Sequence, residues 1–100
     1  LEQVITKALK SSSHPFRLLV ISPILLAPGV GDPGFDPEFN KSSELVSQNL
    51  AVEYEKIAAR YHADFLDAAS VATASETDRQ HLDALGHRLL AEAIYKKITG

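Results

Sequence analysis

The 100-residue chain contains no cysteine, no methionine and no tryptophan. Without cysteine it can hold no disulfide framework, no thiolate nucleophile and no metal site built on thiolates. A chain that lacks methionine and begins at Leu1 does not begin at a native translation start, so we expect that residues have been removed upstream. Any targeting segment would have been removed with them, and its absence here carries no information.

The sequence also has little excess charge and no long hydrophobic run. Its net charge is −3 at pH 7 and its pI is near 5.7, which argues against nucleic acid as the main partner. The longest apolar run, from Leu18 to Ala27, is broken by Ser22 and Pro23, so no membrane span is expected. A hydrophobic content of 45% with 23% charged residues is typical of a single globular domain.

The clearest strand is expected from Phe16 to Leu26. Its centre, Leu18 to Ile21, is apolar at consecutive positions, which predicts burial on both faces in a parallel sheet covered by helices. Pro23 cannot donate a ladder hydrogen bond, so pairing is expected to weaken there. Such a strand needs neighbours along both edges, and the chain offers one other strand candidate, Ala63 to Ala68.

The segments between and on either side of these two strands have apolar residues at helical spacing. A helix capped by Ser42 or Ser43 and running to about Tyr61 is expected between them, and strand, helix and strand in this order predict a right-handed βαβ crossover. Further helices are expected over residues 1–9 and from the N-cap Asp83 to Ile98. The pattern therefore predicts an α/β fold.

A segment rich in proline and glycine, from Ala27 to Asn40, follows the first strand. It leaves the carboxyl end of that strand, where α/β folds bind ligands, and an irregular loop of this length is often functional. The alternative is a surface connector that is anchored by Phe35 and Phe39. The sequence leaves both interpretations open.

Asp78 and His81 are the strongest candidates for chemistry, since they lie three residues apart in a polar loop before the last helix. A carboxylate at this spacing can bond one imidazole nitrogen and fix the tautomer, which leaves the other nitrogen free to accept a proton from a nucleophile. Asp67, at the end of the second strand, is the reserve candidate for the acid. The alternative is a loop histidine beside a capping aspartate, and His87 is expected to be a structural partner.

A metal site is the other chemistry that these residues suggest. Asp78, His81, Asp83 and His87 all carry oxygen or nitrogen ligands. However, His81 and His87 do not have the i, i+4 spacing that places two imidazoles on one helical face, so no metal site is predicted.

The pattern Asp-x-x-His-Leu-Asp-x-x-Gly-His, from Asp78 to His87, resembles the last conserved block of the SGNH (GDSL-type) hydrolases. The resemblance implies a three-layer, flavodoxin-like domain that hydrolyses small acyl or aryl esters without a cofactor. Asp78 and His81 would be the acid and base of its catalytic triad. Arg79 and Gln80 stand where the family more often has glycine and a small aliphatic residue. The preceding Phe-Leu-Asp-Ala-Ala-Ser-Val is most similar to the arylesterase and acyl-esterase branch.

The nucleophile of such a triad is not recognisable in this chain. There is no Gly-x-Ser-x-Gly and no Gly-Asp-Ser, and Gly31-Asp32 is followed by Pro33. None of the serines has a convincing context; they are Ser11, Ser12, Ser13, Ser22, Ser42, Ser43, Ser47, Ser70 and Ser75. In the SGNH family the serine and the oxyanion-binding residues lie in upstream blocks.

The resemblance therefore implies that residues 1–100 are the carboxyl-terminal portion of one SGNH domain. The expected partners are an ester substrate and an amino-terminal segment of the parent protein that carries the serine. The sequence leaves open whether the protein forms a homo-oligomer. The alternative function is that of a non-catalytic α/β segment with a packing or interaction role.

Overall fold

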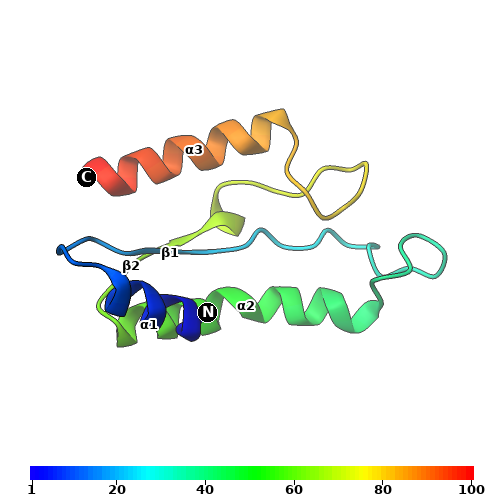
Figure 1. Ribbon diagram of the computed structural model, residues 1–100. Helices are drawn as coiled ribbons and strands as arrows, with labels where there is room; N and C mark the ends of the chain where they lie inside the picture. The colour runs from blue at the N-terminus through cyan, green and yellow to red at the C-terminus, as the bar shows by residue number, and fades with distance from the viewer.

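A computed structural model describes residues 1–100 and shows a mixed α/β architecture, as the sequence predicts. Two short strands alternate with three helices and one short 3₁₀ helix (Figure 1). The elements in chain order are α1 (Glu2–Ser11), β1 (Leu19–Ser22), α2 (Lys41–Arg60), β2 (Asp64–Asp67), η1 (Ala68–Ser70) and α3 (Ala84–Thr99).

The two strands form a parallel sheet in the order β1-β2, with Leu19 opposite Asp64 and Ser22 opposite Asp67. Helix α2 connects them, so the predicted βαβ unit is confirmed. Both strands are shorter than the expected ranges of residues 16–26 and 63–68. Pairing ends where Pro23 follows Ser22, because proline has no N–H to donate to the ladder.

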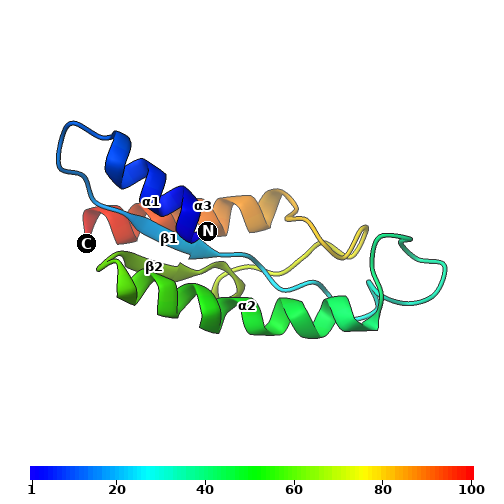
Figure 2. The same ribbon diagram turned by 60° about the horizontal axis from the view of Figure 1, so that its bottom comes forward.

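The sheet lies between helices on both sides, with α3 on one side and α1 and α2 on the other (Figures 1 and 2). The core is the cluster of Ile5, Val20 and Ala58, which come from α1, β1 and α2. Val20 and Ser22 are buried on this side, whereas Leu19 and Ile21 on the opposite face are only half-buried. The expectation of full burial on both faces is therefore wrong for β1.

The helix ends are fixed by side chains at their caps. Helix α2 begins two or three residues earlier than predicted, because Asn40 rather than Ser42 or Ser43 is its N-cap, with Ser43 completing a capping box. Asp83 caps α3 as predicted, and its carboxylate accepts a hydrogen bond from the N–H of Gly86 at 2.8 Å. None of the helices is long and apolar enough to cross a membrane.

Candidate active site

The loop between η1 and α3 brings Asp78 and His81 into direct contact. Asp78 Oδ2 lies 2.7 Å from His81 Nδ1, as the three-residue spacing predicts. The second carboxylate oxygen accepts hydrogen bonds from the backbone N–H groups of His81 and Gln80, both at 3.0 Å, and from the Ser75 hydroxyl at 3.1 Å. All of these partners lie within three residues of Asp78, so the loop itself builds the pair.

Backbone hydrogen bonds keep this loop closed. The N–H of Ser75 donates to the carbonyl oxygen of His81 at 2.7 Å, and the N–H of Arg79 donates to the carbonyl oxygen of Ser75 at 3.0 Å. Arg79 has a φ of 60°, a left-handed conformation that turns the chain between the acid and the imidazole. The carbonyl of Arg79 then accepts from the N–H of Ala27 at 2.9 Å, which joins the loop to the chain that follows β1.

The electrostatics of the loop favour an ionised carboxylate. The backbone N–H of His81, then that of Gln80, then the His81 ring and the Ser75 hydroxyl hold the pKa of Asp78 well below its usual value, against a smaller opposing effect of desolvation. An ionised carboxylate can only accept, so Nδ1 of His81 carries the proton of that bond. In the neutral ring, Nε2 then has the lone pair, and it has no hydrogen-bond partner in the chain.

Arg79 and Gln80 connect the Asp78–His81 loop to the segment 27–40, which the sequence did not reveal. The Arg79 guanidinium donates to the carbonyl of Gly29 at 3.0 Å and lies 4.0 Å from the centroid of the Phe35 ring. The Gln80 amide donates to Asp36 Oδ2 at 2.8 Å. The two residues that differ from the SGNH pattern are therefore the ones that hold segment 27–40 beside the Asp78–His81 pair.

Helix α2 anchors the same segment from the other side. The carboxylate of Glu44 accepts hydrogen bonds from the N–H groups of Gly29 and Gly31, at 3.4 and 3.2 Å. Lys41 pairs with Asp32, and this pairing lowers the pKa of Asp32 and raises that of Lys41. Segment 27–40 is thus held by hydrogen bonds from α2 and from the Asp78–His81 loop, which agrees with both interpretations of this segment.

The packing of segment 27–40 against the start of α2 makes Gly31 sensitive to substitution. A Cβ at Gly31 would lie 2.2 Å from the carbonyl oxygen of Asn40, the N-cap of α2. We expect Gly31→Ala to lower the free energy of unfolding by about 1–3 kcal/mol, because backbone has to move to accept the methyl group. Chemical denaturation of the protein that carries residues 1–100 measures this loss.

Gly86→Ala is the matched control, since Gly86 is also buried but would meet chiefly the flexible end of the Leu82 side chain. The gain in helix propensity, up to about 1 kcal/mol, offsets that contact, so a smaller loss is expected. Equal losses for the two variants would contradict the backbone clash at Gly31.

The other candidate residues are placed away from this pair. Asp67, the reserve acid, accepts from the Ser22 hydroxyl at 2.9 Å and from the N–H of Ala69 at 3.0 Å, so it joins the ends of the two strands and caps η1. His87 is exposed in the first turn of α3. Histidine, aspartate and glutamate side chains do not gather in any group of three or more that could hold a metal ion.

No serine hydroxyl of the chain is hydrogen bonded to His81. Ser75 donates to Asp78, Ser22 to Asp67 and Ser70 to a backbone carbonyl, whereas Ser47 accepts from the N–H of Leu26. The site therefore contains an imidazole with an oriented acid, but no hydroxyl that the imidazole could activate.

Three solved structures of esterases are similar to this chain. An aryl esterase from M. smegmatis has a TM-score of 0.73 and 26% identity, and the match covers 89% of this chain and 41% of that one. For a carbohydrate acetylesterase from Sinorhizobium meliloti the TM-score is 0.73 and the identity 29%, over 83% and 38% of the two chains. A protein from Agrobacterium tumefaciens assigned as an arylesterase has a TM-score of 0.61 and 34% identity, again over 83% and 38%. The resemblance to the SGNH hydrolases is confirmed.

The matches cover nearly all of this chain but only part of each solved structure. Another crystal structure shares the fold, with a TM-score of 0.84 at 24% identity over 97% of this chain and 46% of its own. The chain thus spans less than half of the length of the solved structures that it matches. No family model and no curated protein matches the sequence.

Proposed function

We propose that residues 1–100 supply the base and the acid of a serine-dependent carboxylic-ester hydrolase of the GDSL type. One observation carries the proposal: His81 Nδ1 lies 2.7 Å from Asp78, while its Nε2 has no partner in the chain. The His81 side chain is 76% exposed, so a nucleophile from outside these residues can reach it. The esterases among the similar structures support ester hydrolysis as the reaction.

His81 would act first as a base and then as an acid. Nε2 takes the proton of a serine hydroxyl as the serine oxygen attacks the ester carbonyl carbon, and the Asp78 carboxylate stabilises the imidazolium that forms. The imidazolium returns that proton to the departing alcohol when the acyl–oxygen bond breaks. A water molecule then attacks the acyl-enzyme, again giving its proton to Nε2, and the acid leaves as serine is restored.

The serine and the oxyanion donors come, in this proposal, from an amino-terminal segment of the same parent protein. The chain itself offers no hydroxyl bonded to His81, and this observation is also what the rival function, a non-catalytic packing segment, predicts. The two functions make different predictions, because only the catalytic one requires His81 Nε2 for turnover. In the packing role the hydrogen bonds of Asp78 would only hold the loop in its conformation.

Exchange of the acid in the parent protein tests the proposal. We expect Asp78→Asn to lower kcat for p-nitrophenyl acetate by roughly 10²–10⁴-fold, because an amide can hold His81 in the wrong tautomer. Since the pKa of Asp78 is lowered, its stabilising contribution is fully present above roughly pH 4 and is lost only as the pH falls further. Assays near neutral pH therefore compare variants with the wild-type carboxylate fully ionised.

Ser75→Ala is the control for this exchange. It removes one hydrogen bond to Asp78 and leaves the backbone donors and the His81 ring in place, so less than about a tenfold loss is expected. A serine-directed phosphonate should abolish the activity of the wild-type parent. Unchanged turnover in Asp78→Asn, or activity that resists the phosphonate, would contradict the proposed mechanism.

A further inference from the structure

Arg79 lies between the acid and the base of the proposed triad, and it is attached to segment 27–40 through both its backbone and its side chain. Its carbonyl oxygen accepts a hydrogen bond from the N–H of Ala27 at 2.9 Å. Its guanidinium donates to the carbonyl oxygen of Gly29 at 3.0 Å and lies 4.0 Å from the centroid of the Phe35 ring. One residue thus fastens its loop to this segment at three points.

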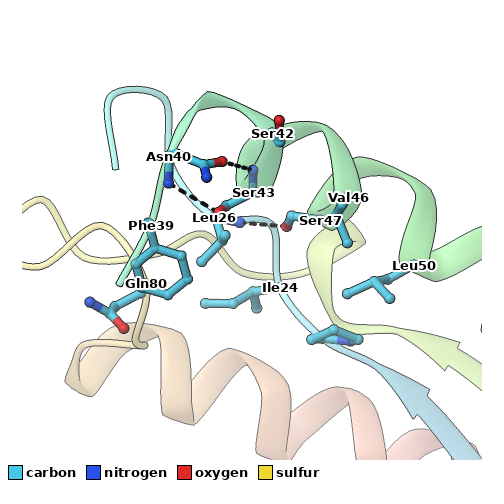
Figure 3. Close-up of a pocket in the computed structure, with 11 residues that line it drawn as sticks. Ile24, Leu26, Phe39, Asn40, Ser42, Ser43, Val46, Ser47, Leu50 and Gln80 are labelled. Carbon is cyan, nitrogen blue, oxygen red and sulfur yellow. Dashed lines mark hydrogen bonds between the residues drawn. The ribbon is translucent and has the colours of Figure 1, made fainter. Parts of the chain in front are cut away.

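Gln80 supplies a second side-chain attachment to the same segment. Its amide donates to Asp36 Oδ2 at 2.8 Å, while its backbone N–H donates to the Asp78 carboxylate at 3.0 Å. Figure 3 shows the Gln80 side chain next to that of Phe39, and both residues line a hollow beside the first turns of α2. Gln80 therefore bonds the acid on one side and segment 27–40 on the other.

The hydrogen bonds inside the loop and those to segment 27–40 fix different things. Asp78 and His81 are held together by groups within three residues, so their contact depends on the loop alone. Three hydrogen bonds join residues 74–82 to distant parts of the chain, and each of them involves Arg79 or Gln80. These long-range bonds set where the loop lies relative to the chain that follows β1.

The Arg79 side chain is held in place and not free in solvent. It is 34% exposed, and its guanidinium lies 3.9 Å from Asp32 Oδ2. Its φ of 60° is a conformation that residues with a side chain rarely adopt and that glycine adopts freely. An arginine here accepts an unfavourable backbone conformation, and its contacts with Gly29 and Phe35 offset part of that cost.

We propose that Arg79 is a positioning residue, whose side chain fixes the Asp78–His81 loop against segment 27–40 so that His81 Nε2 keeps one place relative to the attacking serine. Gln80 supports the same position. The inference rests on the proposed function. A misplacement of about 1 Å can slow a reaction by roughly 100-fold, so these attachments affect turnover even though they leave the Asp78–His81 contact intact.

Arg79→Ala in the full parent protein tests this role. We expect kcat for p-nitrophenyl acetate to fall by roughly 10–100-fold and KM to change by less than about threefold. The midpoint of the pH profile of kcat/KM should stay at its wild-type value, because the Asp78–His81 contact remains. Asp78→Asn, in contrast, should move that midpoint to lower pH, since it removes the charge that stabilises the imidazolium. Arg79→Lys keeps a cation and a donor, so kcat should recover to within about fivefold of the wild type.

Arg17→Ala is the matched control, because Arg17 is also a long-range attachment. Its guanidinium donates to the carbonyl oxygen of Ile98 at 3.2 Å and to Asp64 at 2.8 Å, at the start of β2 and near the end of α3. Its loss should change kcat by less than about threefold. Thermal unfolding and kcat at two temperatures below the transition separate misplacement from partial unfolding, since a loss caused by unfolding shrinks on cooling.

Gln80→Ala provides a second test should Arg79→Ala not fold. It removes the Asp36 bond but keeps the backbone N–H that binds Asp78, and we expect a three- to tenfold lower kcat, roughly, with little change in KM. Equal kcat losses in Arg79→Ala and Arg17→Ala would overturn the inference and leave the proposed function standing. A shifted pH midpoint in Arg79→Ala, or wild-type turnover in Gln80→Ala, would do the same. A wild-type parent without phosphonate-sensitive ester hydrolysis would contradict the proposed function itself.

Discussion

We expect His81→Ala in the parent protein to reduce kcat for p-nitrophenyl esters by roughly 10³–10⁶-fold while the protein stays folded. His81 is the one histidine of this chain that is paired with an acid, and its second ring nitrogen has no hydrogen-bond partner in the chain. Its side chain is largely exposed and only the Asp78 contact holds it, so its removal leaves no buried cavity. Steady-state kinetics and circular dichroism on the same preparations separate lost chemistry from lost structure.

His87→Ala is the matched control for this prediction. His87 is also an exposed histidine, six residues later, and its side chain bonds no acid. We expect it to change kcat by less than about threefold, as most surface substitutions change little. A larger loss in His87→Ala than in His81→Ala would move the base from the loop onto α3 and overturn the assignment of His81.

Residues 1–100 expressed alone should be unstable or self-associated, and should not hydrolyse esters. Only 11 of the 100 residues are buried, and twelve large hydrophobic side chains are exposed, among them Leu45, Val52 and Leu85. The radius of gyration is 15.4 Å, against about 13 Å for a typical domain of this length. Strand β1 is paired along one edge only, so its other edge is open to a further strand.

Sedimentation, thermal unfolding and p-nitrophenyl acetate turnover measure these three properties, with the full parent protein as the reference. The expected result is self-association in sedimentation or a non-cooperative thermal unfolding transition. The rate of p-nitrophenyl acetate hydrolysis should not exceed the rate in buffer without protein. A stable monomer with a cooperative transition and phosphonate-sensitive activity would contradict the prediction. One of the nine serines would then have to be the nucleophile.

The sequence by itself determined the elements whose signals are local. The caps and apolar spacing predict α3 from Asp83, and the apolar run predicts a strand whose pairing weakens at Pro23, although β1 is shorter than the expected range. The Asp78–His81 contact is also local, because all partners of the carboxylate lie within three residues in one loop. Interactions this close in sequence depend on turn geometry more than on the rest of the fold, so residue types and spacing suffice to predict them.

The tertiary structure alone decided which distant segments meet at the site. Nothing in the spacing of Arg79 and Gln80 indicates that they bond Gly29 and Asp36, about 50 and 44 positions earlier in the chain. The N-cap at Asn40 also depends on how segment 27–40 packs against α2. Side-chain contacts across such separations are fixed by the packing of the whole domain. Many residues of the chain could form a hydrogen bond with each of these polar groups, and only the fold decides which of them lies within hydrogen-bond distance.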